Sequence, residues 1–172
     1  DSLISDSKVF ASETINLINE LENSNIKCES LSIDINEAKK NLDTCAYIYD
    51  WLLSAGSERN SILISIGGGV TTDIVGFVAS SWLRGLNVIH FPTSLAAMVD
   101  ASIGGKTGVN FKHGKNLIGA FKQPLLIGMD TKSLETLKER DLNSGWAEAI
   151  KHAFLFDQSL LKKFQTQCKD II

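Results

Sequence analysis

Apolar and polar positions follow two different periods along the chain, and each period predicts one kind of element. Continuous apolar runs at 61–66 and 87–91 are typical of strands that a parallel sheet buries on both faces. Weaker runs at 27–33 and 125–130 indicate two further strands. Apolar residues at helical spacing occupy three longer segments, which are 7–23, 36–55 and about 71–83. This alternation of strands and helices predicts an α/β fold with a parallel sheet.

The character of the chain changes in its second half. Residues 100–120 are rich in glycine and polar side chains, which predicts a long irregular loop of the kind that is usually functional. From about 133 onward the pattern is helical. We therefore expect an α/β domain over 1–130 and the beginning of a helical domain over 131–172. Roughly forty residues are too few for an independent core, so we expect this second domain to be truncated.

The most informative stretch joins a predicted strand to a predicted helix through Gly67, Gly68 and Gly69. Glycine lets the chain turn sharply and leaves backbone N–H groups open to an anion at the helix start. Asp73 is expected in the first turn of that helix, where it would repel a phosphate and suits a hydroxyl better. The motif is not the Gly-x-Gly-x-x-Gly fingerprint, so a phosphate or dinucleotide site and a tight turn without ligand both remain open.

Composition and charge exclude several classes of partner. Apolar residues make up 44% and charged residues 22% of the 172 positions, as in globular proteins, and a net charge of −3 gives no reason to expect nucleic acid. No run approaches the roughly 18 apolar residues of a membrane span, and we find no signal peptide. The three cysteines, at positions 28, 45 and 168, are widely spaced, which indicates reduced thiols in a cytoplasmic protein. We expect Cys45 in the core.

Polar residues gather in the predicted loop, namely Asp100, Lys106, Asn110, Lys115 and Asn116. Two lysines and two amides could bind a phosphorylated, hydroxyl-rich substrate, and the alternative is a solvated polar loop. The sequence Gly105-Lys106-Thr107 does not complete a P-loop, because Asp100 stands where that motif requires glycine.

Two acid–base pairs share a helix face at a spacing of three residues. Glu148 and Lys151 form one, in apolar surroundings, and Glu37 and Lys40 form the other. Either pair could be functional or a surface ion pair, which is the commoner case.

The histidines, at positions 90, 113 and 152, lack the spacing of metal ligands, so spacing does not support a metal site made by this chain alone. His90, in a predicted strand, is expected to be a hydrogen-bonded core or edge residue.

Six motifs together resemble the 3-dehydroquinate synthase family of sugar-phosphate cyclases. Val99-Asp-Ala-Ser-Ile-Gly-Gly-Lys-Thr-Gly-Val-Asn110 is the longest, and the others occupy 67–77, 84–85, 92–95, 114–121 and 147–151. The resemblance implies an NAD-binding α/β domain, a helical domain and an active site between them. It implies a cytoplasmic lyase of the shikimate pathway that uses NAD and a divalent metal, usually zinc. The implied reaction converts 3-deoxy-D-arabino-heptulosonate 7-phosphate to 3-dehydroquinate, and the implied assembly is a homodimer.

The resemblance also implies roles for individual residues. The implied cofactor-binding residues are Glu37, Lys40, Gly69, Val70, Asp73, Thr93, Ser94, Lys106, Lys115, Ser133 and Thr136. The implied substrate-binding residues are Asp100, Lys106, Asn116 and Lys151. Asp100, Lys106 and Lys151 are the implied catalytic residues, and Glu148 is the implied metal ligand.

The chain also departs from the pattern of that family. Two metal-binding histidines of the family are expected further downstream than this sequence extends. His152 is not at the family's second ligand position. We also expect the first strands of the cofactor domain to be missing. A single carboxylate binds zinc poorly, so we predict little or no synthase activity for this chain alone. A related cyclase that makes a valiolone or an inosose, and a catalytically dead binding or assembly remnant, are the alternatives.

Overall fold

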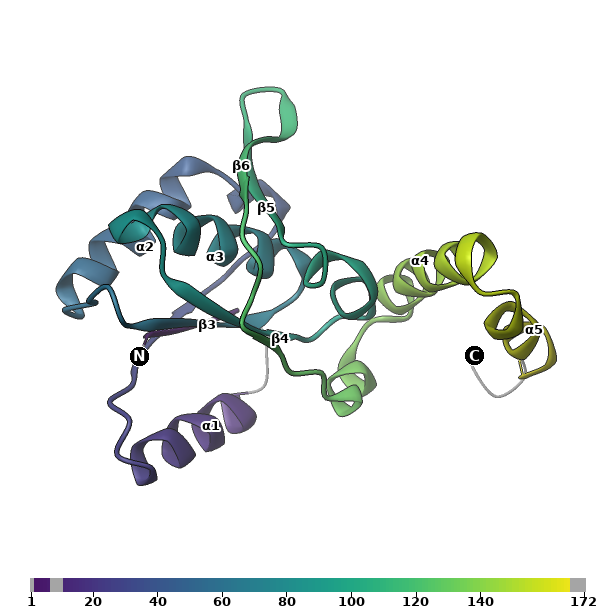
Figure 1. Cartoon of the computed structure of the whole chain (residues 1–172), viewed down its shortest axis with the longest axis horizontal. Coiled ribbons are helices and arrows are strands. Elements are labelled where there is room, and N and C mark those ends of the chain that lie inside the picture. Colours follow the sequence, from purple (N-terminus) through teal and green to yellow (C-terminus); the bar gives the residue numbers. More distant parts are fainter. Residues whose placement is uncertain (1, 7–10, 168–172) are drawn as a thin grey trace.

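The computed structural model describes residues 2–6 and 11–167, and a parallel sheet lies at its centre. Five strands pair in the order β2-β1-β3-β4-β7, all in parallel. The strands are β1 (Ser2–Asp6), β2 (Glu29–Ile33), β3 (Ile62–Gly67), β4 (Asn87–Pro92) and β7 (Leu126–Ile127). Helix α1 (Ala11–Asn23) covers one face, and α2 (Leu42–Ser54) and α3 (Gly69–Ser81) cover the other (Figure 1). The α/β fold with a parallel sheet is confirmed.

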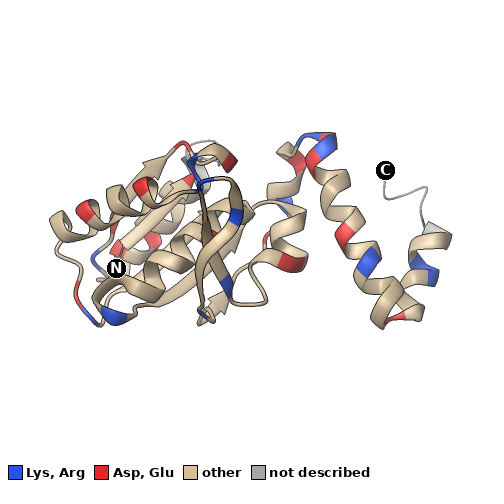
Figure 2. Ribbon diagram, turned by 90° about the horizontal axis from the view of Figure 1, so that it is seen from above, with Lys and Arg blue, Asp and Glu red and all other residues tan. Residues whose placement is uncertain are grey.

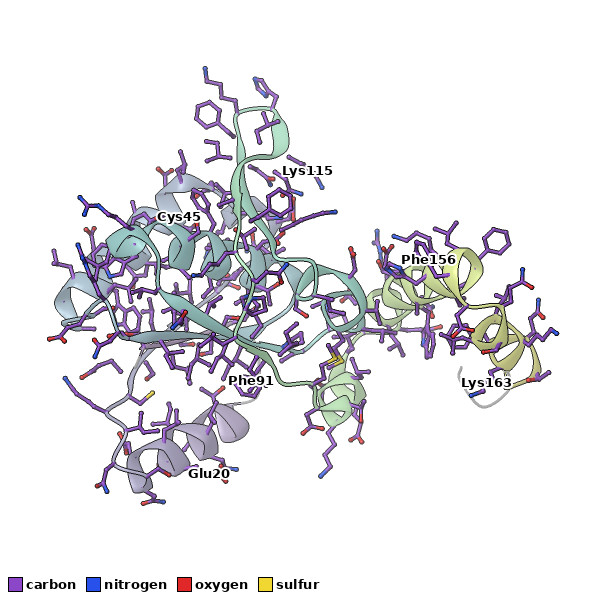
Figure 3. All side chains as sticks on the ribbon, in the orientation of Figure 1. Glu20, Cys45, Phe91, Lys115, Phe156 and Lys163 are labelled. Atoms are coloured by element: carbon purple, nitrogen blue, oxygen red, sulfur yellow. The ribbon has the colours of Figure 1, made fainter. Side chains whose placement is uncertain are left out.

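The central strands β3 and β4 are mostly apolar because both faces of the sheet are covered. Leu63 in β3 points into a core with α2 and α3, which also contains buried Cys45, as predicted (Figure 3). Ile64 and Ile66 point the other way, into a second core with side chains of α1. Successive side chains of a strand alternate between faces, so a strand between two layers of helices needs apolar residues at nearly every position.

Two expectations for the first half of the chain need correction. Strand β1 was not predicted, because its Ser-Leu-Ile-Ser-Asp sequence is short and half polar, yet it lies between β2 and β3. The predicted helix over 36–55 is two elements, the 3₁₀ turn η1 (Glu37–Lys39) and α2. Asn41 separates them, since its side chain accepts a hydrogen bond from the N–H of Thr44 at 3.0 Å and caps α2. The predicted helix over 7–23 corresponds to α1, and residues 7–10 lie outside the described part.

The predicted irregular loop over 100–120 is wrong for most of its length. It contains the antiparallel hairpin of β5 (Lys106–Phe111) and β6 (Gly114–Phe121), preceded by the π-helical segment η3 (Ala97–Ala101). The glycines that indicated a loop serve close packing instead. Gly108 and Gly119 face each other across the hairpin. A Cβ on Gly76 of α3 would strike the side chain of Thr107, so that glycine lets the hairpin lie directly on α3.

The last part of the described chain, 131–167, is helical, as predicted from 133 onward. The 3₁₀ turn η4 (Thr131–Thr136) leads into α4 (Glu139–Phe156) and α5 (Gln158–Gln167), which extend away from the sheet (Figure 1). Acidic and basic residues are interspersed along these helices and over the sheet part (Figure 2). None of the helices within residues 2–6 and 11–167 combines the length and apolar character that crossing a bilayer requires.

His90 is a buried, hydrogen-bonded core residue, as predicted. Its Nδ1 lies 2.6 Å from the hydroxyl oxygen of Ser65 on the neighbouring strand, and only 2% of the residue is exposed. Burial disfavours the charged ring and lowers the pKa of His90 to about 4 from its ordinary 6.5.

This lowered pKa predicts acid-sensitive stability. As the pH falls below 6.5, the unfolded chain protonates this ring first, so the stability present above pH 6.5 is lost on the way to pH 4. We expect about 2 kcal/mol less stability at pH 5 than at pH 7 from this residue. Urea unfolding at both pH values checks this. The variant His90→Gln keeps a polar partner for Ser65 but does not titrate. Its loss of unfolding free energy between pH 7 and pH 5 should be smaller by that amount. An equal loss in both proteins would contradict the attribution of this pH dependence to His90.

Candidate cofactor and substrate site

The glycine turn lies where ligands bind in open parallel sheets. The chain runs from β1 outward to β2 and then returns to β3 on the other side of β1, so the strand order reverses between β1 and β3. Ligands bind beyond the carboxyl ends of the strands at such a reversal. Gly68 is the N-cap of α3 and offers no side-chain acceptor, so the first N–H groups of that helix are available to an anion. The N–H of Thr93 donates to the carbonyl of Gly67 at 2.9 Å and ties the end of β4 to this turn.

Two neighbouring segments pack against the turn. A Cβ on Gly69 would come within 3.3 Å of Ala101, and one on Gly68 within 3.4 Å of the hydroxyl of Ser94. The turn is therefore enclosed by η3 and by the segment that follows β4. Val70, by contrast, packs partly against the core between the sheet and α2–α3.

Asp73 lies further along α3 than expected. It is in the second turn of the helix, because the helix begins at Gly69. Its carboxylate accepts a hydrogen bond from the ammonium of Lys40 at 2.5 Å. Burial raises the pKa of Asp73, and the positive charge of Lys40 opposes this effect, while the negative charges of Glu37 and Asp100 add to it. Asp100 is therefore within electrostatic range of Asp73.

Lys40 is buried in an interior ion pair. It is 5% exposed, and its ammonium donates both to Asp73 and to the side-chain oxygen of Asn116, at 2.6 Å. The alternative of a surface Glu37–Lys40 pair is wrong for this reason. Glu37 instead accepts a hydrogen bond from Asn110 at 3.0 Å and pairs with Lys115 at 3.4 Å. The Asn110 hydrogen bond and the nearby Lys115 lower the pKa of Glu37.

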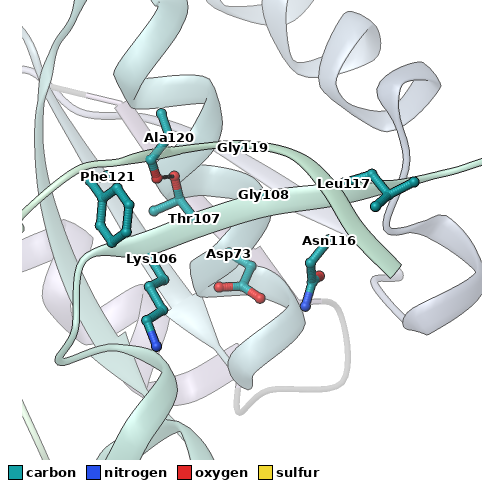
Figure 4. A pocket seen from close by; sticks show the side chains of 9 residues that line it. All are labelled: Asp73, Lys106, Thr107, Gly108, Asn116, Leu117, Gly119, Ala120 and Phe121. Carbon is teal, nitrogen blue, oxygen red and sulfur yellow. Dashed lines mark hydrogen bonds between the residues drawn. The ribbon is translucent and has the colours of Figure 1, made fainter. Parts of the chain in front are cut away.

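A cleft of about 360 Å³ lies beside α3 and the β5–β6 hairpin. Three polar side chains from separate parts of the sequence are directed to the same side of the hairpin, namely those of Asp73, Lys106 and Asn116 (Figure 4). The rest of the lining consists of Thr107, Gly108, Leu117, Gly119, Ala120 and Phe121. The cleft thus offers cationic, anionic and amide groups to one ligand.

A second, more apolar cleft of about 210 Å³ lies on the α1 side of the sheet edge. Thr93 and Ser133, both predicted cofactor contacts, line it together with Leu17, Ile66 and Phe91. Thr136 is exposed and belongs to the lining of neither cleft. Asp73 and Lys106 are the predicted cofactor residues that line the first cleft, and Thr93 and Ser133 are those that line the second.

Asp100, Glu148 and His152 form a possible metal-binding group. One ligand atom from each lies within 4.8 Å of the others, and Nε2 of His152 is 3.5 Å from Oε1 of Glu148. That nitrogen is shielded from solvent and has no hydrogen-bond partner among the described residues. Lys151 pairs with Glu148, as the three-residue spacing predicted, and lowers the pKa of its carboxyl group. Carboxylate and imidazole donors suit zinc and related cations.

Sequence spacing did not indicate this group, because Asp100 joins it from η3. Gly145 makes the approach possible. A Cβ there would lie 2.5 Å from Cβ of Leu95 and 2.7 Å from the backbone nitrogen of Ala96, so α4 packs against this segment backbone to backbone. A glycine inside a helix, three residues before a polar residue, is the signal that could have suggested the contact.

Comparison with known proteins decides the family. Residues 30–144 match the family described as 3-dehydroquinate synthase N-terminal. The chain belongs to this family. The 3-dehydroquinate synthase of Synechococcus sp. (strain CC9605) is 48% identical over 153 residues, which are 89% of this chain and 41% of that protein. The enzyme of Crocosphaera subtropica (strain ATCC 51142 / BH68) is 47% identical over 167 residues, 97% of this chain and 46% of that protein. The chain thus spans less than half the length of these relatives.

Solved structures of sugar-phosphate cyclases share the fold. The 2-epi-5-epi-valiolone synthase ValA of Streptomyces hygroscopicus subsp. jinggangensis 5008, with NAD⁺ and Zn²⁺ bound, has a TM-score of 0.91 at 32% identity, over 99% of this chain and 48% of that one. A 2-deoxy-scyllo-inosose synthase complexed with carbaglucose-6-phosphate, NAD⁺ and Co²⁺ has a TM-score of 0.81 at 28% identity, over 88% of this chain and 42% of that one. Both of these structures contain NAD⁺ and a divalent metal.

Proposed function

We propose that this chain is the NAD- and substrate-binding part of a metal-dependent 3-dehydroquinate synthase. The proposed reaction converts 3-deoxy-D-arabino-heptulosonate 7-phosphate to 3-dehydroquinate with elimination of phosphate. The observation that carries this proposal is the cleft between α3 and the β5–β6 hairpin, where Asp73, Lys106 and Asn116 meet. Membership of the 3-dehydroquinate synthase family supports it.

The turn and the second cleft fit a dinucleotide. The glycine turn lets a pyrophosphate approach the N-terminus of α3, because Gly68 and Gly69 leave the space next to Ser94 and Ala101 that side chains would fill. The apolar lining around Phe91 suits a flat base, with Thr93 and Ser133 as polar contacts. Glu37, held ionised, is an acceptor for ribose hydroxyls.

The remaining groups fit a sugar phosphate and a divalent metal. Lys106 presents an ammonium to the first cleft, where it would bind a phosphate or carboxylate. Asp100 accepts hydrogen bonds from substrate hydroxyls, and Lys151 places a second positive charge beside Glu148. Glu148 would hold the metal, with Asp100 and His152 within reach. When bound, NAD supplies reversible hydride transfer and the metal polarises a substrate oxygen.

The proposal extends to zinc as the metal, a cytoplasmic location and a homodimer. Zinc in a related structure supports the first of these. Cys28 and Cys45 are free thiols, as expected in a reducing compartment. Sedimentation of the purified chain tests the dimer, and a monomer at all concentrations would contradict that part.

A related cyclase activity is the second candidate. The high TM-score with the valiolone synthase favours it, whereas the higher sequence identities, up to 48%, are with 3-dehydroquinate synthases. Ligand preference of the chain separates the two.

Titration calorimetry with NAD, followed by the sugar phosphate, tests the proposal. We expect the chain to bind NAD, and the NAD-loaded chain to prefer 3-deoxy-D-arabino-heptulosonate 7-phosphate to glucose 6-phosphate. Lys106→Ala should weaken binding of the heptulosonate at least tenfold, because it removes the ammonium from the cleft. Lys112→Ala, on the same hairpin outside the cleft lining, is the matched control and should bind like the unmodified chain. Absence of NAD binding, or a preference for glucose 6-phosphate, would contradict the proposal.

A further inference from the structure

Asn110 of β5 forms hydrogen bonds to three of the predicted site residues. It does so through both polar atoms of its side chain and through its backbone N–H. Its side-chain Nδ2 donates to Oε1 of Glu37 at 3.0 Å, and its Oδ1 accepts from the backbone N–H of Asn116 at 2.8 Å. Its own N–H donates to the carbonyl of Lys40 at 2.8 Å. One residue thus fixes η1 against the hairpin.

The backbone is shaped for this arrangement. The register of β5 and β6 shifts between Val109 and Phe111, so Asn110 lies at an irregularity of the ladder. Such a bulge re-aims a side chain that would otherwise follow the strand. Asn116 has a φ of 53°, a left-handed conformation that L residues seldom adopt, and its N–H is the group that Asn110 holds.

The contacts continue from Asn110 to the cleft. Asn116 accepts from the ammonium of Lys40, and the same ammonium donates to Asp73 on α3. Asn110 is not part of the cleft lining, so it acts on the site through these neighbours. The amide of Asn110 donates to Glu37 through its nitrogen and accepts from Asn116 through its oxygen, so the two contacts use separate atoms.

We propose that Asn110 is a positioning residue that fixes Glu37, Lys40 and Asn116 for NAD binding. This inference rests on the proposed function, because it assigns the result of the positioning to the dinucleotide. An aspartate at this position would keep the acceptor for Asn116 but would place a carboxylate against that of Glu37. A donor on residue 37 would remove the conflict.

The decisive test exchanges the hydrogen-bond donor and acceptor between residues 110 and 37 and measures the affinity for NAD. We expect Asn110→Asp to weaken NAD binding at least tenfold, and the double variant Asn110→Asp with Glu37→Gln to bind within threefold of Glu37→Gln alone. Asn60→Asp, the same change in an exposed turn at the other end of β3, should leave affinity unchanged. Recovery assigns the lost affinity to the contact between residues 110 and 37, because a loss unrelated to that contact would remain in the double variant. Unchanged affinity in Asn110→Asp, or no recovery in the double variant, would overturn the inference.

A second measurement does not depend on NAD. Amide hydrogen exchange of Asn116 should be at least tenfold faster in Asn110→Ala, because its N–H loses its acceptor, while the amides of β3 keep their rates. If the unmodified chain fails to bind NAD, the proposed function fails, and this exchange result alone decides whether Asn110 positions the hairpin. An unchanged rate at Asn116 would overturn that role.

Discussion

Replacing Lys40 by methionine is expected to lower the free energy of unfolding by about 3 kcal/mol. The ammonium of Lys40 is the cation that balances Asp73, and their side chains are only 6% and 19% exposed. Methionine fills similar space but leaves a buried carboxylate without its partner, and also leaves the oxygen of Asn116 without a donor. Urea unfolding at pH 7 measures the change.

The double variant Lys40→Met with Asp73→Asn is the control. It removes both charges, and the new amide can donate to Asn116, so we expect most of the lost stability to return. If both variants are equally unstable, loss of packing rather than the unpaired charge is responsible. If Lys40→Met unfolds like the unmodified chain, the interior ion pair does not exist in solution.

Replacing Gly145 by alanine is expected to destabilise the chain by about 2–3 kcal/mol, the reverse of its ordinary effect in a helix. Alanine is normally better than glycine in a helix interior by about 1 kcal/mol. Here the new Cβ would meet Leu95 and the backbone of Ala96, which cannot rotate away. Helix α4 must then move from η3, and Glu148 and His152 move with it, away from Asp100.

Thermal unfolding of the Gly145→Ala variant measures this change, and Ser144→Ala is the matched control. Ser144 is the exposed neighbour on the same helix, so alanine there should be neutral or slightly stabilising. Cobalt absorption spectroscopy adds a second readout, because a displaced α4 separates the possible metal ligands. A stabilised Gly145→Ala variant with unchanged cobalt binding would contradict the close contact of α4 with η3.

Local patterns predicted those parts of the fold that local physics decides. The strand β3, the glycine turn and α3 follow one another with clear changes of period, so the sequence predicts them well. The β5–β6 hairpin was missed because its glycines are typical of loops. In the structure, Gly108 and Gly119 are glycines because the backbone of the opposite strand leaves no room for a Cβ. That contact is not visible until both strands are placed.

In the candidate site, too, local contacts were predicted and contacts between distant segments were not. The pairing of Glu148 with Lys151 follows from helical spacing alone and was predicted. The burial of Lys40 against Asp73 depends on how η1 packs on α3, which spacing cannot reveal. The approach of Asp100 to His152 likewise depends on the contact between η3 and α4. The roles of individual residues stay predictions that the family resemblance supplies.

The position of β1 between β2 and β3 has a consequence for how this chain is made. Residues 2–6 are synthesised before 29–33 and 63–66, with which they pair, so one edge of β1 has no partner until β3 has been synthesised. An unpaired apolar strand edge can associate with other chains. Slow translation through the segment between α1 and β3 therefore lengthens the period during which nascent chains are prone to aggregate.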